Sequence, residues 1–140
     1  MSIEFEGLTE FQRDLLEVAQ VRLPKETFKI MRKIGSKART QIAKEARSKV
    51  KKDTGTYHKR FKRGKVFKGD DGAIVVRIIN SSPHAHLIEH GHRLVKGGNE
   101  IGFVAGKKVM DSGLANFDNS GDYEKMISEW LDEELDKGNL

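Results

Sequence analysis

The feature that most constrains the fold is one long amphipathic stretch in the first half of the chain. Its apolar or small side chains recur at steps of three and four residues, which places them on one face of an α-helix. They are Phe28, Met31, Ile34, Gly35, Ala38, Ile42, Ala46 and Val50. Pro24 suits the first turn of such a helix, and Asp53-Thr54-Gly55 provides a stop. The pattern predicts a long helix over residues 25–52.

Two shorter stretches also have helical spacing. Near the start of the chain the stripe is Leu8, Phe11, Leu15, Val18 and Ala19, with Thr9 or Gly7 as the cap. Near the end it is Tyr123, Met126, Ile127, Trp130, Leu131 and Leu135. These stripes predict an amphipathic helix within residues 1–22 and a C-terminal helix that starts at Asn119, Ser120 or Asp122.

Between the helices the apolar period changes from that of a helix to that of a strand. After Thr56 the side chains alternate between two faces, with Tyr57, Lys59, Phe61 and Arg63 on one and His58, Arg60 and Lys62 on the other. Residues 69–72 (Gly-Asp-Asp-Gly) are typical of a hairpin turn. The run from Ala73 to Ile79 is the most apolar of the chain. We therefore expect two or three antiparallel strands, with residues 73–80 as the central one.

The region after Pro83 predicts shorter elements. Residues 84–91 fit one or two helical turns that Gly91 ends, and residues 92–95 and 101–104 fit two strands joined by a loop. Several glycines make residues 105–117 a predicted loop. The whole chain, residues 1–140, is then a single α+β domain. Its N-terminal helices pack on a small antiparallel sheet at 56–104, and 105–140 adds a loop and the C-terminal helix.

Composition excludes several classes of protein. A chain of 140 residues can bury one core without disulfides, and it contains no cysteine. No apolar run approaches the ~20 residues that cross a bilayer. The acidic first residues lack the order of a signal peptide. We expect a soluble protein with no membrane partner.

Charge is strongly segregated along the chain, although the formal net charge is only +5. Residues 22–68 contain 18 Lys or Arg against three acidic residues, whereas residues 118–140 contain two Lys against eight. The basic middle could bind nucleic-acid phosphates, or it could be solvated or face an acidic segment of a neighbouring subunit. The candidate contacts for subunit or nucleic acid are Lys59, Arg60, Lys62, Arg63 and Lys65.

Four of the five histidines lie within nine residues, as His84, His86, His90 and His92. Imidazoles at this spacing are candidate metal ligands, and with Glu89 they suggest a metal-dependent hydrolase. The string does not match His-Glu-x-x-His, however, and no second catalytic constellation accompanies it. We interpret the cluster as structural and expect no metal, no cofactor and no catalysis. The hydrolase is kept as an alternative to be tested.

Five features occur in a recognisable order. The long basic helix is followed by Asp53-Thr54-Gly55, then by a hairpin and the motif Ala-x-x-x-Glu-x-Gly at Ala85, Glu89 and Gly91. A Phe-Val-x-Gly-x-x-x-Met motif follows, with Phe103, Gly106 and Met110. In this order the chain resembles the head–tail joining, or tail-completion, proteins of tailed bacteriophages and prophages, also called neck or minor tail proteins. Lys59 and Arg60 depart from the pattern, which commonly has hydrophobic or serine residues there.

The resemblance implies an α+β structural protein without catalysis. It implies a ring, often a hexamer, between the head connector and the tail tube, although the free protein could be a monomer. The implied partners are other copies of the chain, head-completion or connector proteins, and the tail tube or tail terminator protein. The implied location is the virion's head–tail junction, reached from the host cytoplasm. Gly55 and Gly91 then serve the backbone, and Glu89 accepts hydrogen bonds from loop N–H groups.

Overall fold

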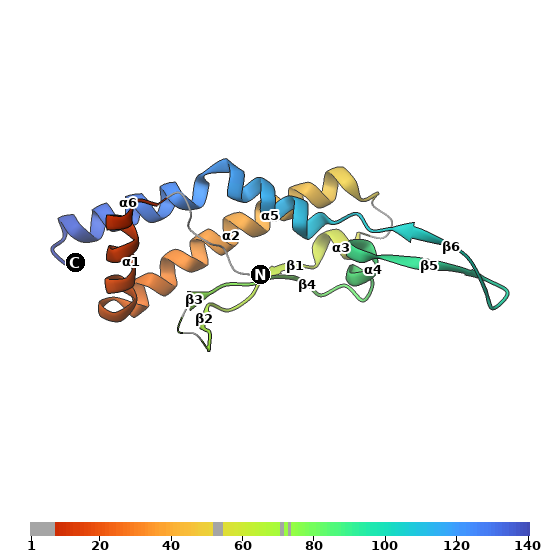
Figure 1. Cartoon of the computed structure of the whole chain (residues 1–140), viewed down its shortest axis with the longest axis horizontal. Coiled ribbons are helices and arrows are strands. Elements are labelled where there is room, and N and C mark those ends of the chain that lie inside the picture. Colours follow the sequence, from red (N-terminus) through yellow and green to blue (C-terminus); the bar gives the residue numbers. More distant parts are fainter. Residues whose placement is uncertain (1–7, 52–54, 71, 73) are drawn as a thin grey trace.

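The computed structural model describes residues 8–51, 55–70, 72 and 74–140 and shows an elongated α+β protein (Figure 1). The helices are α1 (Glu10–Arg22), α2 (Pro24–Lys49), α3 (Thr56–Lys59), α4 (Ala85–His90), α5 (Val109–Ser120) and α6 (Asp122–Asp136). The strands are β1 (Phe61–Arg63), β2 (Phe67–Lys68), β3 (Ile74–Val75), β4 (Ile78–Asn80), β5 (Gly91–Lys96) and β6 (Asn99–Ala105). The predicted α+β class is confirmed. In the described part of the chain no helix is both long and apolar enough to cross a membrane.

The helices form one layer along the long axis. α2 runs in one direction and α5 and α6 return beside it, while α1 crosses at the end where α6 finishes (Figure 1). Thr9 caps α1 in a reciprocal capping box with Gln12. The Thr27 hydroxyl donates to the backbone oxygens of Ala19 and Leu23, which ties the start of α2 to the end of α1.

The stripe predicted for α2 is buried, but the one predicted for α1 is only partly so. Ile34, Ala38 and Ile42 are fully buried under α5, α6 and the hairpin formed by strands β1 to β4. In α1, by contrast, Phe11 and Val18 are exposed, and Leu16 is buried together with Ala19. The predicted face of α1 is therefore confirmed for Leu8 and Ala19, which are buried, and for Leu15, which packs on the core, and is wrong for Phe11 and Val18.

The loop predicted over residues 105–117 is wrong, because α5 occupies most of it. Val109, Gly113 and Phe117 recur every four residues and face α2. A Cβ on Gly113 would lie 2.8 Å from the Ile42 Cα, so only glycine permits this approach of the two helices. The glycine that indicated a loop instead serves close helix packing.

The predicted central strand is also wrong. Residues 61–80 form an interrupted antiparallel hairpin in which β1 pairs with β4 and β2 with β3, and each strand has a single partner. Val76 lies at the interruption because it packs onto α2, where a Cβ on Gly35 would lie 2.7 Å from its Cγ2. Residues 56–59, predicted as strand, are the helical turn α3, which follows Gly55 at φ 85° and buries Tyr57.

The β5–β6 hairpin is the third two-stranded sheet and projects from the end opposite α1 (Figure 1). Its antiparallel register runs from Gly91 opposite Ala105 to Lys96 opposite Asn99, with a bulge between Leu94 and Val95. We call residues 91–105 the arm. Both strands and the short helix before them agree with the predicted elements.

Candidate assembly surface at the Glu89 corner and the arm

The arm leaves the body at a corner where two backbones touch. Gly91 has φ 87° and ψ 176°, a conformation essentially restricted to glycine, and a Cβ there would lie 2.8 Å from the Gly106 nitrogen. A Cβ on Gly106 would lie 2.7 Å from the His90 carbonyl carbon. Two glycines from different motifs therefore allow the end of α4 to contact the end of β6.

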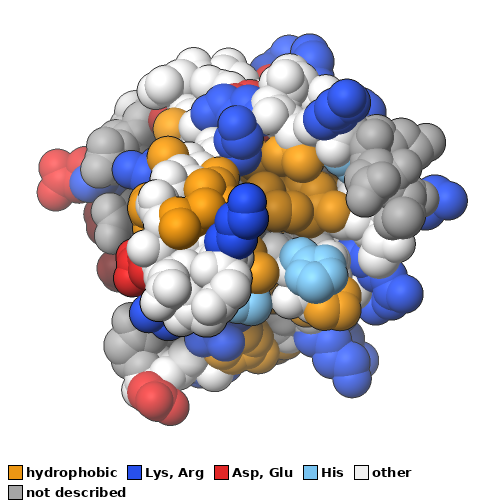
Figure 2. Space-filling model, turned by 90° about the vertical axis from the view of Figure 1, so that its right-hand side faces the viewer, with side chains coloured by type: hydrophobic (Ala, Val, Ile, Leu, Met, Phe, Trp, Pro, Cys, Tyr) orange, Lys and Arg blue, Asp and Glu red, His pale blue; other side chains and the backbone are white. Residues whose placement is uncertain are grey.

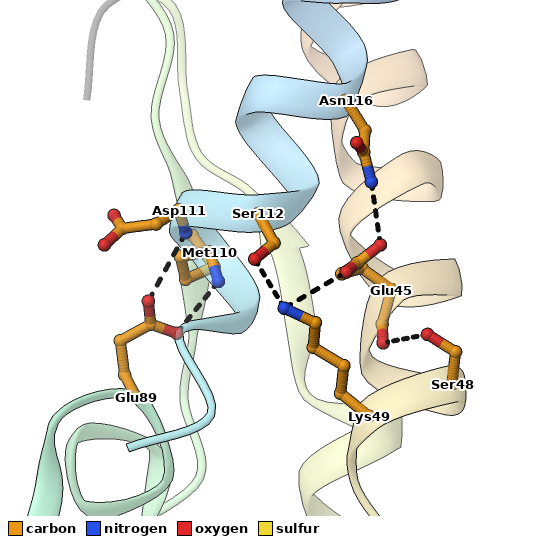
Figure 3. Close-up of polar contacts among 8 residues, drawn as sticks. All are labelled: Glu45, Ser48, Lys49, Glu89, Met110, Asp111, Ser112 and Asn116. Atoms are coloured by element: carbon orange, nitrogen blue, oxygen red, sulfur yellow. Dashed lines mark hydrogen bonds and ion pairs between the residues drawn. The ribbon is translucent and has the colours of Figure 1, made fainter. Parts of the chain in front are cut away.

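Glu89 joins this corner to α5 (Figure 3). Its side chain is 8% exposed, and its Oε1 and Oε2 accept from the backbone N–H groups of Met110, at 2.8 Å, and Asp111, at 3.3 Å. These are first-turn donors of α5, whose N-cap residue Lys108 provides no side-chain cap. A carboxylate here also interacts favourably with the helix dipole. The expected partners were loop groups, and the structure places them in a helix.

We predict that Glu89→Ala lowers the free energy of unfolding by about 1–3 kcal/mol, because two buried N–H groups lose their acceptor. Glu89→Gln keeps one acceptor oxygen and should lose less. Chemical denaturation of the three proteins measures both values. An Ala variant as stable as the wild type would rule out the capping role.

Burial, together with the charge of Glu89, raises the pKa of Tyr57 from its ordinary 10.0 to about 12. Above pH 10 the unfolded chain ionises this phenol before the folded chain does, so stability is lost as the pH rises. We predict that the ionisation of Tyr57 lowers the free energy of unfolding by about 1 kcal/mol by pH 11. Denaturation curves of wild type and Tyr57→Phe at pH 9 and pH 11 test it, since lysine titration is common to both. Equal losses in the two proteins would contradict the assignment.

A second polar network holds the C-terminal end of α2 against α5 (Figure 3). Lys49 Nζ lies 3.4 Å from a Glu45 carboxylate oxygen and donates to the Ser112 hydroxyl. The Asn116 amide donates to the other Glu45 oxygen at 2.9 Å. The corner thus rests on a helix that is itself fixed to α2.

The four clustered histidines do not converge. His84 and His92 line one cavity, His86 lines another beside Tyr57 and Glu89, and His90 is exposed. Among the residues that the structure describes, no group of three His, Asp or Glu side chains is arranged to hold a metal ion. The fifth, His58, has its Nε2 at 3.0 Å from the Val50 carbonyl oxygen.

The remaining predicted residues lie in different surroundings. Lys59, Arg60, Lys62 and Lys65 are exposed in or beside strand β1. Arg63, in contrast, is half-buried, and its Nη1 donates to the Gly64 oxygen. Ala85 and Met110 are half-buried and pack against the smaller core cluster around Ile42 and Tyr57. Asp53 and Thr54 lie outside the described residues.

The sequence predicts the two strands of the arm but not that their apolar side chains are exposed. Large apolar side chains project from the arm into solvent, with exposed fractions of 41% for Leu94, 61% for Val95, 64% for Ile101 and 62% for Phe103. At its base lies a cavity of about 330 Å³, lined by Val50, His84, Leu87, Ile88, His92, Val104, Ala105 and Lys107. Seen from this end, the molecule shows apolar side chains surrounded by Lys and Arg (Figure 2). Alternating apolar residues in residues 101–104 were the available signal.

Comparison with known families identifies the class of protein. Residues 10–91, which run from α1 to the first residue of β5, match a family of bacteriophage proteins, so the chain is a structural phage component. The chain belongs to the HK97-gp10-like family, described as "Bacteriophage HK97-gp10, putative tail-component". Searches of curated proteins and of solved structures returned no match. The predicted phage family is confirmed, and most of the arm lies beyond the matched residues.

Proposed function

We propose that the chain is a head–tail joining, or tail-completion, protein that forms a ring between the head connector and the tail tube. Membership of a family of tail components supports a place in the virion. The observation that carries the proposal is the arm, whose four large apolar side chains are 41–64% exposed. Exposed apolar groups of this size are typical of surfaces that meet another protein.

The two ends of the molecule differ in charge, which suits a ring. A ring interface joins one surface of a subunit to a different surface of the next. The C-terminal end of α2 and the corner are rich in Lys and Arg, whereas α6 contains seven acidic residues against one Lys. Proposed partners are further copies, a connector or head-completion protein, and the tail tube or terminator protein.

Ring formation should weaken as salt rises, because ions screen the attraction between exposed charges beyond about 10 Å at 0.1 M. Light scattering or native mass measurement across a salt series would follow the oligomer. We expect the mass to fall toward that of the monomer in molar salt. A mass that is unchanged from low to molar salt would contradict a charge-assisted interface.

The proposed position is tested by removing the protein from the phage. Electron microscopy of lysates without it should show full heads and tails that are separate. Supplying the chain in trans should restore joined particles. Joined, infectious particles without the protein would overturn the proposal.

A second candidate function, nucleic-acid binding, is supported by the solvent face of α2. The exposed basic residues on this face are Lys25, Lys29, Arg32, Lys33, Lys37, Arg39, Lys44, Arg47 and Lys49. The two acidic residues of the helix are half-buried, and each lies near a lysine of the same helix. Twenty-six residues at ~1.5 Å each make this face about 39 Å long, enough to follow several phosphates.

Duplex DNA labelled with a fluorophore tests this second function. Binding that weakens steeply with salt, and weakens further in Lys33→Ala/Lys37→Ala, would support it. Lys125→Ala on α6 is the matched control, because it removes one exposed basic side chain from an acidic segment. Absence of binding at low salt would leave only the assembly role.

A further inference from the structure

α1 presents an apolar stripe to solvent. Its members are exposed by 65% (Phe11), 41% (Val18) and 82% (Val21). Phe11 and Val18 are separated by about two turns and therefore share a face, which Val21 continues one turn further. The opposite face of α1, with Leu16 and Ala19, is buried in the core. The helix therefore has apolar residues on two sides, and the described part of the chain covers only one of them.

Acidic residues border this outer stripe. Glu10, Asp14 and Glu17 are all exposed and, at ~100° per residue, lie on the side of the helix that carries Val21, with Asp14 between Val18 and Val21 in projection. Arg22, in the last turn, is the basic residue nearest the stripe in this projection. The outer face of α1 is thus an apolar stripe with an acidic edge.

The arm has the complementary composition. Its exposed apolar side chains are accompanied by Arg93 and Lys96, and by Lys107 and Lys108 at its base, against Glu100 alone. The lengths also correspond: 13 helical residues span ~20 Å, and the seven residues of β6 span ~23 Å. The two surfaces match in apolar character and in length, and they carry charges of opposite sign.

The two surfaces cannot meet within one molecule, because α1 and the arm lie at opposite ends of the long axis (Figure 1). We infer that the arm of one copy binds the outer face of α1 of a second copy, with Val18 close to Ile101. This contact is heterologous and repeats from copy to copy, so it closes a ring or extends a filament. The inference rests on the proposed ring and names the surfaces that form it.

The absence of native cysteine allows a direct test by disulfide cross-linking. Full-length Val18→Cys and Ile101→Cys proteins, one with a mass tag, are mixed at high concentration and oxidised. The matched control mixes Val18→Cys with Ile79→Cys, because Ile79 is an exposed apolar residue (47%) on β4, away from the arm. We expect at least about tenfold more mixed dimer from the Val18–Ile101 pair, since bound sites have a high effective concentration.

Three other results would overturn this inference. The first is equal yields from the two pairs. The second is a self-linked Ile101→Cys dimer in excess of the mixed one, which would show that arms pair with each other. The third is a ring at the head–tail junction in which the mixed pair does not cross-link, and this result leaves the proposed function standing. Absence of the chain from the junction would instead reject the function itself.

Discussion

Replacing Gly91 by alanine is expected to be the most damaging single-methyl change in the chain. The residue has φ 87° and ψ 176°, which costs a non-glycine residue about 1–3 kcal/mol. The added Cβ would also lie 2.8 Å from the Gly106 nitrogen and 2.9 Å from the Phe103 ring. We predict a loss of about 3 kcal/mol or more in the free energy of unfolding, measured by denaturant titration.

Gly97→Ala is the matched control for this variant. Gly97 also has a positive φ, of 59°, but a Cβ there would meet nothing within 4 Å. It should cost about 1–2 kcal/mol, since only the backbone preference for glycine is lost. If the two variants lose the same free energy of unfolding, the close backbone contact at the corner adds nothing to the cost of replacing a positive-φ glycine.

The second large effect concerns assembly and leaves the fold intact. Val95→Ser/Ile101→Ser removes two side chains that are more than half exposed, so the monomer should keep its stability within about 1 kcal/mol. Burying each of them against a partner would contribute about 1.5–3 kcal/mol. We therefore expect association to weaken by at least about 30-fold, as measured by sedimentation of the purified protein across a concentration series.

Ile79→Ser is the control for the arm variant, because it removes an exposed apolar residue from the body of the protein. Its association should equal that of the wild type. If the arm variant associates as tightly as this control, the arm is not the assembly surface. If both associate weakly, the interface extends over β4 as well.

The sequence predicted those elements whose stabilising contacts follow a regular period. The stripe of α2 recurs every three or four residues and is buried by other helices and by strands, so its helix and face were both correct. The β5–β6 hairpin and the helical turn before Gly91 were also predicted, because turn residues mark their ends. These features depend mainly on local sequence.

The errors arise where contacts between distant residues decide the structure. Gly113 indicates a loop in isolation, yet the approach of α5 to Ile42 requires it. The apolar run 73–79 indicates one strand, but the packing of Val76 on α2 interrupts it. In α1 the periodic stripe was taken to face the core, whereas Phe11 and Val18 face solvent and are available to another molecule.

The candidate site was predicted in part. Glu89 and Gly91 were singled out from their motif, and the structure shows what each contacts. The exposure of the arm could not be inferred, because four apolar residues in a hairpin are equally compatible with a buried sheet. Only the three-dimensional arrangement of the described residues shows that these side chains are 41–64% exposed.

The most direct test of the account is electron microscopy of the assembled head–tail junction at side-chain resolution. We predict a closed ring of this chain between connector and tail tube, with the arm of each copy lying on α1 of the next. A junction that lacks this chain would contradict the account. So would one in which its copies are present but every arm projects into solvent without contacting any protein.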